Sequence, residues 1–361
     1  MNRETLLPAI KEGKVTLATL DDKVRRILRT AIRFGWLDKD QTDLSWPLYG
    51  EEGRMLALES SESSMVLLKN EGSLLPLSAA KVRTVAVIGP DAYPAVPVGG
   101  GSARVQPFTS VSYLQGLSDF LSGAATVLYK RGLTPLTETF GSTAYVTDLK
   151  GGPAGLKGEY FNNPDLSGTA AFTRQDANIN FNWDKPNGWP GGVQNNYSVR
   201  WTGYFIPPQS GEYRFAAQDY GLDEYRLYLD GKKLMDREGQ VQPLTVKLLR
   251  LQGGKPYALR LEYAHHDHHS LMGFGIASSD KMIDPEAMAL SKGADFVVLC
   301  AGFDPSNEGE GSDRTFELPY GQDELIHAVE AVNPRTVVVV TSGGAVDMTK
   351  WVDKVPAILE A

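Results

Sequence analysis

The class of this fold is set by Asp295-Phe296-Val297-Val298-Leu299-Cys300-Ala301-Gly302, which leads into the acidic loop Glu308-Gly309-Glu310-Gly311-Ser312-Asp313-Arg314. The first run is apolar almost throughout, as expected for a parallel strand that is buried on both faces. Folds of the α/β class keep their chemistry at the carboxyl ends of such strands, and the glycines permit turns that project an acidic side chain. Local composition leaves two interpretations of the loop open, a general acid and a solvated surface loop.

Helix and strand patterns alternate on both sides of a central gap. Apolar residues recur at helical spacing in 19–34, with Thr19 as the predicted N-cap and Gly35 as the stop signal. Further helices are predicted over residues 51–68, 111–121, 286–292 and 322–332, and strands over 85–88, 125–129, 296–301 and 336–341. This alternation predicts an α/β fold in which a parallel sheet is flanked by helices.

The central gap has a different pattern. From about residue 157 to residue 276 the strand signals are short and alternate polar with apolar residues, as in 199–205 and 257–263. Asp230-Gly231 lies between two such runs and is a strong hairpin signal. The sequence therefore predicts an antiparallel β-sandwich inserted into the α/β domain.

Composition excludes several classes of partner. The 361 residues carry 36 Lys and Arg against 44 Asp and Glu, a net charge of −8. This balance argues against nucleic acid and against an anionic membrane surface. No apolar run reaches the roughly 18 residues of a membrane span.

Cys300 is the only cysteine and is predicted to be an inert buried side chain. The chain ends in the apolar run 356–361 without a covering helix, from which we expect a longer polypeptide.

Four parts of the α/β segments resemble glycoside hydrolase family 3, in the order expected of that family. They are Leu67-Leu68-Lys69-Asn70-Glu71-Gly72-Ser73-Leu74-Leu75-Pro76-Leu77; Val87-Ile88-Gly89-Pro90 with Gly99-Gly100-Gly101-Ser102-Ala103; Glu310-Gly311-Ser312-Asp313-Arg314 with Leu318-Pro319 and Gln322; and residues 337–340 with Gly343-Gly344 and Trp351. Residues 3–37 look like the end of the family's (β/α)8 barrel and the connector that leaves it.

The central gap resembles the carbohydrate-associated module first described in anthrax protective antigen, the PA-14 type. The likeness lies in residues 158–161, 198–203, 211–215 and 227–232. The two resemblances imply three parts. Residues 1–50 are the end of the barrel and the connector, 51–153 and 279–361 form an α/β sandwich domain that is incomplete at its C-terminus, and 154–278 form the PA-14 type β-sandwich.

The resemblance implies a retaining β-glucosidase that hydrolyses terminal non-reducing β-D-glucosyl residues of short oligosaccharides without a cofactor. It places the general acid/base at Glu310, with Glu308 as the competitor two residues away. Retaining glycosidases need two carboxyl groups about 5–5.5 Å apart. The family's nucleophile is an Asp in a Ser-Asp-Trp type motif, and no Ser-Asp pair of this chain is followed by Trp. The expected partner is therefore the barrel-bearing remainder of the polypeptide, without which these residues are predicted to be inactive.

Aromatic residues of the sandwich are candidates for binding the sugar. Trp183 and Trp189 lie in the Asn-, Gly- and Pro-rich segment 180–196, an expected loop in which exposed rings would stack on substrate. The loop 99–102 lacks the spacing of a phosphate-binding loop and is predicted to border the sugar site. Asp313 and Arg314 are expected to pair with each other or with nearby backbone and to hold the shape of the acidic loop.

No metal site is predicted. The His-rich run 265–269 is expected to be a polar loop tip, because neighbouring residues of a strand point to opposite faces and bring at most two imidazoles together. Asp219 and Asp223 do not reproduce the adjacent pair of aspartates that binds calcium in some members of the sandwich family.

The main alternative from another class is a non-catalytic carbohydrate-binding protein that acts through the β-sandwich. Among enzymes, a β-xylosidase and an exo-β-glucanase stay open, because specificity would lie largely in the barrel. The sequence does not specify the compartment or the oligomeric state, and a homo-oligomer stays open.

Overall fold

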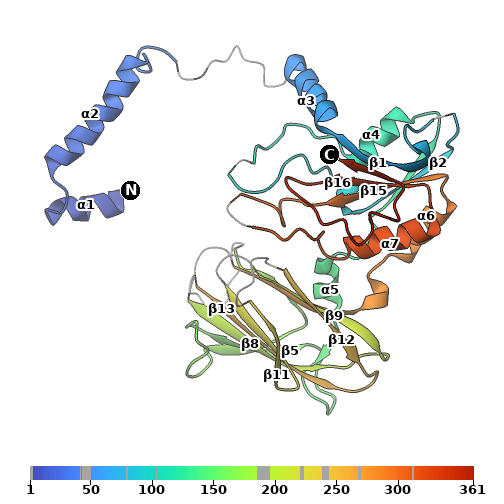
Figure 1. Ribbon diagram of the computed structural model, residues 1–361. Coiled ribbons are helices and arrows are strands. Elements are labelled where there is room, and N and C mark those ends of the chain that lie inside the picture. The colour runs from blue at the N-terminus through green and yellow to red at the C-terminus, as the bar shows by residue number, and fades with distance from the viewer. Residues whose placement is uncertain are drawn as a thin grey trace. The chain divides into compact units, whose positions relative to one another are not determined.

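The computed structural model describes residues 3–40, 42, 50–78, 80–102, 104–184, 196–219, 223–237, 244–266, 270–310 and 313–361. The chain divides into two compact units, Met1–Glu62 and Ser63–Ala361 (Figure 1). The first unit contains α1 (Arg3–Lys11), α2 (Leu17–Arg33) and most of α3 (Glu51–Ser64). Within the described ranges, no helix is both long and apolar enough to cross a membrane.

The helix predicted over 19–34 forms, with an earlier start. Thr16 is the N-cap of α2, because its hydroxyl oxygen accepts a hydrogen bond from the backbone N–H of Thr19 at 3.1 Å. Thr19 itself therefore lies in the first turn, and the predicted N-cap was wrong by three residues.

The helix predicted over 51–68 is shorter than expected. α3 ends at Ser64, and Val66–Asn70 form strand β1, which pairs antiparallel with β17 (Ala357–Glu360). A short apolar run of this kind fits either a helix or a strand by its local pattern. The pairing with β17, a segment far along the chain, decides the outcome here.

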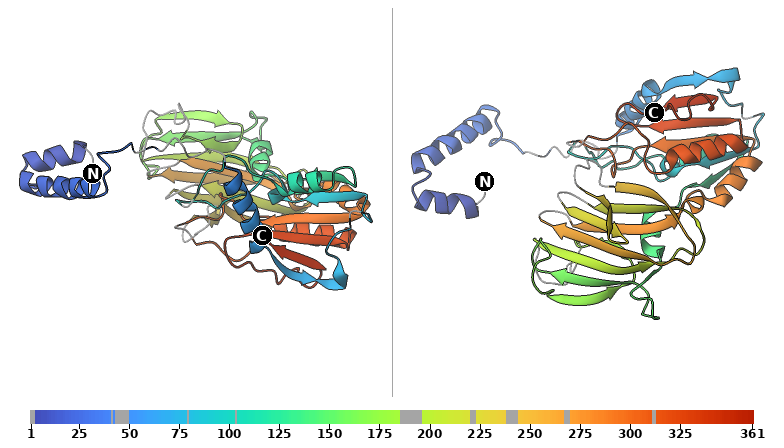
Figure 2. Two further views of the ribbon diagram at one scale, coloured as in Figure 1. Left: turned by 90° about the horizontal axis from the view of Figure 1, so that it is seen from above. Right: turned by 60° about the horizontal axis from the view of Figure 1, so that its bottom comes forward.

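The α/β part contains a six-stranded sheet in the order β1-β17-β16-β15-β2-β3. Its remaining strands are β2 (Thr84–Ile88), β3 (Thr126–Lys130), β15 (Phe296–Gly302) and β16 (Thr336–Thr341). All neighbours are parallel except β1 and β17, and the strands lie side by side in Figure 2. The predicted fold class, a parallel sheet flanked by helices with an inserted antiparallel sandwich, is confirmed.

Helices cover both faces of the sheet. The odd-numbered residues of β15 pack with α6 (Pro285–Gly293) and α7 (Gln322–Val332), and the even-numbered residues pack with α4 (Tyr113–Phe120). Every residue of β15 is buried, Cys300 included. The apolar run 296–302 is thus a central strand, buried on both faces.

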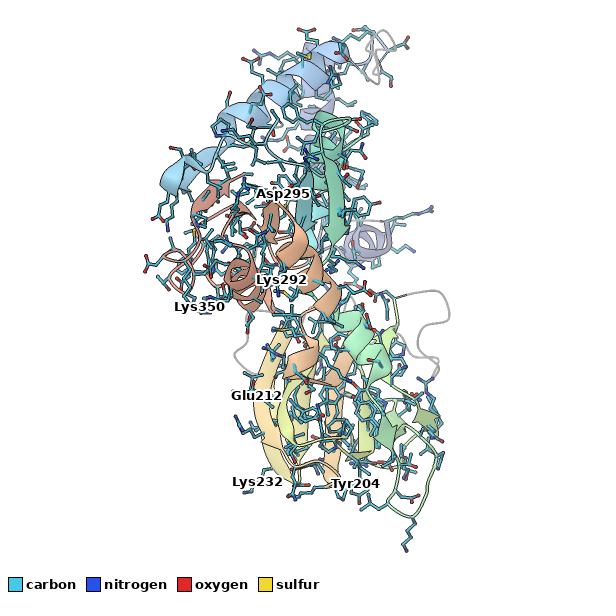
Figure 3. All side chains as sticks on the ribbon, turned by 90° about the vertical axis from the view of Figure 1, so that its right-hand side faces the viewer. Tyr204, Glu212, Lys232, Lys292, Asp295 and Lys350 are labelled. Atoms are coloured by element: carbon cyan, nitrogen blue, oxygen red, sulfur yellow. The ribbon has the colours of Figure 1, made fainter. Side chains whose placement is uncertain are left out.

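Asp295 marks the amino end of the sheet. Its Oδ2 accepts hydrogen bonds from the backbone N–H groups of Arg83 at 2.8 Å and Thr84 at 3.0 Å, which ties the starts of β15 and β2 together. The Asp295 side chain is labelled in Figure 3. The carboxyl ends of both strands therefore meet at the opposite edge of the sheet, after Ile88 and Gly302.

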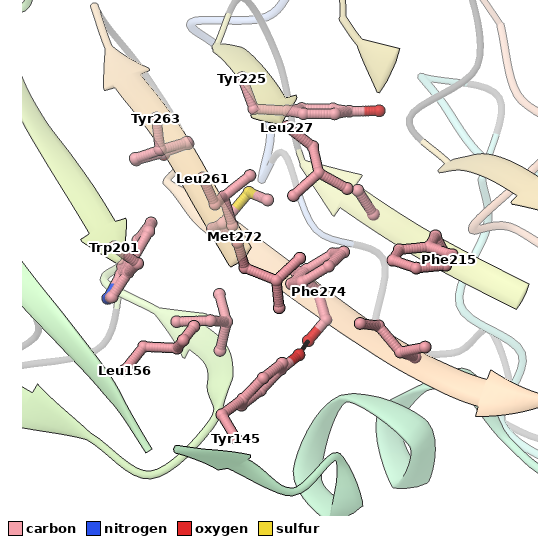
Figure 4. Close-up of a cluster of buried hydrophobic side chains, with 14 of the residues drawn as sticks. Tyr145, Leu156, Trp201, Phe215, Tyr225, Leu227, Leu261, Tyr263, Met272 and Phe274 are labelled. Carbon is pink, nitrogen blue, oxygen red and sulfur yellow. Dashed lines mark hydrogen bonds between the residues drawn. The ribbon is translucent and has the colours of Figure 1, made fainter. Parts of the chain in front are cut away.

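The inserted part consists of two antiparallel sheets. One has the strand order β11-β10-β13-β8-β5-β6, with β4 paired to β8, and the other has the order β12-β9-β14-β7. Both sheets contribute large side chains to one core, among them Trp201 and Leu261 from the first and Phe215 and Phe274 from the second (Figure 4). The elements are α5 (Leu136–Ser142), β4 (Tyr145–Val146), β5 (Leu156–Phe161), β6 (Phe172–Asp176), β7 (Ile179–Asn182), β8 (Tyr197–Phe205), β9 (Gly211–Asp219), β10 (Glu224–Leu229), β11 (Lys232–Asp236), β12 (Leu244–Leu251), β13 (Tyr257–His265) and β14 (Leu271–Ser278).

A short stem closes the insertion where the chain leaves and re-enters the α/β part. Leu133 and Ile283 form an antiparallel bridge, the N–H of Thr134 donates to the carbonyl of Met282 at 2.9 Å, and the N–H of Asp284 donates to the carbonyl of Gly132 at 2.9 Å. Because this stem holds both ends of the insertion together, the chain leaves the α/β part after β3 and re-enters it before β15 at neighbouring points.

Asp91 is a buried carboxyl directly beyond β2, in the 3-10 helix Pro90–Ala92. It is 3% exposed, and its Oδ2 has no hydrogen-bond partner in the described part of the chain. Burial, and then repulsion by Asp304, raises the pKa of Asp91 from 3.8 to about 7, while Arg131 opposes this shift. The folded protein therefore favours the protonated carboxyl.

We expect Asp91 to make the protein less stable as the pH rises from about 4 to 7. Its raised pKa means that the folded state retains a proton which the unfolded chain has released, so the contribution is full at low pH and is lost as the pH passes the folded pKa. The shift corresponds to at most roughly 4 kcal/mol. Asp91→Asn should flatten this part of the pH dependence in urea-unfolding measurements. Parallel curves for the variant and the unchanged protein would contradict it.

Candidate active site

Two loops meet at the carboxyl edge of the sheet. The N–H of Gly100 donates to the carbonyl of Glu308 at 2.8 Å, and the N–H of Glu310 donates to the carbonyl of Gly100 at 3.3 Å. These bonds form a short parallel bridge between Gly100 and Gly309. The Gly-rich segment 99–102 after β2 therefore lies against the acidic loop after β15.

Glycine is required where the two loops touch. A Cβ atom on Gly100 would lie 2.9 Å from the carbonyl oxygen of Pro305 and 3.0 Å from that of Glu308. Gly101 has φ +90°, and a Cβ there would lie 2.6 Å from the Cβ of Glu310. Such contacts are too short for any other residue, so the glycines let the second loop position Glu310.

Glu310 is exposed on this edge. Its Oε2 accepts a hydrogen bond from the backbone N–H of Ser102 at 3.0 Å, and the hydroxyl of Ser102 donates to the same oxygen. Two donors on one oxygen orient the carboxyl group while its accessibility to an incoming molecule is kept. Ser102 belongs to the loop 99–102 that was predicted to border the sugar site, but its hydrogen bonds to Glu310 were not predicted.

Glu308 has a different environment. Its Oε1 pairs with Nε of Arg314 at 2.5 Å, and its Oε2 accepts from the backbone N–H of Gly343 at 2.8 Å. Its side chain is 21% exposed, and that of Arg314 is 11% exposed. Both oxygens of Glu308 therefore serve to hold the loop.

Arg314 binds nearby backbone groups, which is one of the two arrangements predicted for it. Its Nη1 donates to the carbonyl oxygens of Thr315 and Ala345 at 3.0 Å each, and its guanidinium group lies 3.7 Å from the centre of the Phe303 ring. The carboxylate that pairs with its Nε is that of Glu308, which the sequence predicted only as a competing acid.

Gln322 fixes the point where the acidic loop begins. Its side-chain oxygen accepts from the N–H of Gly302 at 2.7 Å, and its side-chain nitrogen donates to the carbonyl of Gly302 at 3.0 Å. Gln322 is buried at the start of α7, so a rigid helix holds the end of β15.

The expectation that Trp183 lies on an exposed loop was wrong. Trp183 is 8% exposed and belongs to the sandwich core, where its ring is stacked 4.9 Å from that of Phe181 and 6.4 Å from that of Trp201. The apolar ring gains more from this packing than from exposure, which leaves little of it for stacking on a sugar. Trp189 lies outside the described residues.

The histidine run also differs from its prediction. His265 is the last residue of β13 and is buried, with Nδ1 2.7 Å from Oδ1 of Asp223, so it is not part of a loop tip. Residues 267–269 lie outside the described ranges. Asp219 is also buried and pairs with Arg237 at 3.1 Å. In the parts of the chain that the structure covers, no three His, Cys, Asp or Glu side chains gather to hold a metal ion.

Residues 65–361 match the family model described as the glycosyl hydrolase family 3 C-terminal domain. A β-glucosidase of Rhizobium radiobacter is 30% identical over 379 residues, which cover 99% of this chain and 44% of that protein. The probable β-glucosidase K of Aspergillus fumigatus is 27% identical over 386 residues, 98% of this chain and 47% of that protein. The chain thus spans less than half of the length of these curated relatives.

Solved structures give the same picture of the fold. A β-glucosidase from Streptomyces venezuelae in complex with D-glucose is 26% identical, with a TM-score of 0.54, and the match covers 99% of this chain and 40% of the other. A β-glucosidase from Kluyveromyces marxianus, at 24% identity and a TM-score of 0.50, supports the fold alone; its match covers 99% of this chain and 46% of the other. From the family match over residues 65–361, the chain belongs to glycoside hydrolase family 3 and carries that family's C-terminal domain.

Proposed function

We propose that this chain supplies the general acid/base of a retaining β-glucosidase, and that Glu310 has this role. The observation that carries the proposal is the contrast between two neighbouring carboxyl groups. Glu308 uses both oxygens in the loop, whereas Glu310 is exposed and is oriented by Ser102. A general acid must reach the leaving oxygen, and only the second carboxyl combines orientation with access.

In this proposal Glu310 acts twice. It first donates its proton to the glycosidic oxygen as the bond to the anomeric carbon breaks and the nucleophile forms a glycosyl-enzyme. The resulting carboxylate then takes a proton from a water molecule as the oxygen of that water attacks the anomeric carbon, which releases the nucleophile. Ser102 stabilises the carboxylate form between the two steps.

The nucleophile and most of the sugar pocket would come from a barrel on the remainder of the polypeptide, so we expect the 361 residues alone to hydrolyse nothing. The names of the matched relatives favour a glucosyl substrate over a xylosyl one. We also propose that the sandwich is a PA-14 type module.

Glu310→Gln in the full-length polypeptide tests the assignment. Loss of the acid should lower kcat/KM about 10²–10⁴-fold for substrates with poor leaving groups, such as cellobiose. It should largely spare kcat/KM for an activated aryl glucoside, whose leaving group needs no proton. The kcat for the aryl glucoside should still fall, because Glu310 also activates water in the second step. Azide, which attacks without a base, should restore this kcat. Steady-state kinetics on both substrates measure these effects, and an equal loss on both would contradict the role.

Glu308→Gln is the matched control. It removes one charge two residues away and breaks the pair with Arg314. We expect a lower melting temperature and a similar, modest loss of activity on both substrates, without rescue by azide. The opposite pattern, in which only this variant distinguishes the leaving groups, would move the acid/base role to Glu308.

Ser102→Ala is expected to change the pH dependence of activity. The hydroxyl donates to the ionised carboxyl of Glu310, so its removal should favour the protonated form. The basic limb of the kcat/KM profile should move up by about one pH unit, because a hydrogen bond to a charged group contributes roughly 1.5 kcal/mol. Ser102→Thr retains the hydroxyl and should restore the original profile. An unchanged profile for Ser102→Ala would show that Ser102 only packs against the loop.

A further inference from the structure

A cavity of about 470 Å³ lies beside the acidic loop, at the carboxyl ends of β2 and β15. Its size is within the range of pockets that hold small molecules. The charged residues of its lining are Asp91, Arg104, Arg131 and Asp304, and Gln106, Ser110 and Ser306 add neutral polar groups. Prolines such as Pro305 supply much of the apolar wall. Glu310 does not line this cavity.

The topology of the sheet singles out this position. From β2 the chain continues through α4 to β3 on one side, and from β15 it continues through α7 to β16 on the other. α4 and α7 cover opposite faces, so β2 and β15 are the neighbours at which the strand order diverges. Open α/β sheets bind ligands in the crevice outside the carboxyl ends of two such strands.

Three adjacent strands each deliver a charged residue to the cavity. Arg131 directly follows β3, Asp91 lies just beyond β2, and Asp304 lies just beyond β15. Arg104 comes from the loop that carries Ser102 and is exposed at the rim. The groups are close enough for the charges of Asp304 and Arg131 to act on Asp91.

Asp91 has a hydrogen-bonding capacity that the folded chain does not use. It is 97% buried, and Oδ2 has no partner among the described residues. A buried carboxyl oxygen without a partner costs free energy, which a ligand that donates a hydrogen bond would recover. This is a second observation, independent of the strand order, that points to a ligand.

The charges in the cavity select the class of ligand. An anion would suit the two arginines and be repelled by Asp304, whereas a cation would suit Asp304 and be repelled by the two arginines. A hydroxyl group both donates and accepts, so it satisfies carboxyl and guanidinium groups alike. We propose that this cavity binds a neutral monosaccharide at a site separate from Glu310.

Binding of D-glucose to the protein, measured by calorimetry, tests the proposal. Arg104→Ala combined with Arg131→Ala removes two exposed side chains and should weaken binding about tenfold or more, since each lost charged hydrogen bond contributes roughly 1.5 kcal/mol. Lys247→Ala combined with Arg250→Ala removes the same charge from β12, outside the cavity, and should leave binding unchanged. Glu310→Gln should also leave it unchanged.

Three results would overturn the proposal. One is no binding of D-glucose. Another is equal binding of D-glucose by the variant that lacks Arg104 and Arg131 and by the control variant that lacks Lys247 and Arg250. The third is loss of binding in Glu310→Gln, which would place the sugar at the acid/base. Inorganic phosphate serves as the anionic probe, and if it binds in place of glucose the ligand class is wrong. None of these results depends on hydrolysis, so they are separable from the role proposed for Glu310.

Discussion

The close approach of three backbone segments at the end of β15 is the constraint on which the site depends. A Cβ atom on Gly89 would lie 1.9 Å from the carbonyl oxygen of Cys300, and one on Gly302 would lie 2.0 Å from that of Thr341. Both glycines have positive φ, +118° and +146°. Only glycine allows β2, β15 and β16 to end this close together, and the two loops that carry Ser102 and Glu310 leave the sheet from there.

Two carboxyl groups two residues apart acquire different chemistry because their surroundings differ. Glu308 faces Arg314, which is largely buried and lies over Phe303, so its charge is compensated and its oxygens are occupied. Glu310 faces Ser102 and solvent, so one oxygen is oriented while the group remains accessible. Sequence spacing alone cannot separate the two roles, because either residue could occupy the projecting position of a Gly-rich loop.

The sequence predicts the parts of the fold that local patterns determine. The run 295–302 is apolar on both faces and becomes the central strand, and the alternating runs become the strands of the sandwich. Residues 66–68 of β1 were assigned to the end of a helix, because the strand that pairs with them, β17, lies at the other end of the chain. Trp183 was predicted to lie on an exposed loop because the segment around it is rich in Asn, Gly and Pro. Local composition does not show that this ring packs in the sandwich core. Asp91 was not singled out from the sequence, because its burial depends on contacts across the sheet.

The sandwich is connected to the site through α7. Arg214 of β9 pairs with Glu324 of α7 at 3.2 Å and lies over the ring of Tyr320. Gln322, two residues before Glu324, forms hydrogen bonds with both the backbone N–H and the backbone carbonyl of Gly302. A contact of the insertion therefore acts on the same helix turn that fixes the start of the acidic loop. Because such a hydrogen-bonded turn is rigid, this contact of the insertion stabilises the start of the acidic loop.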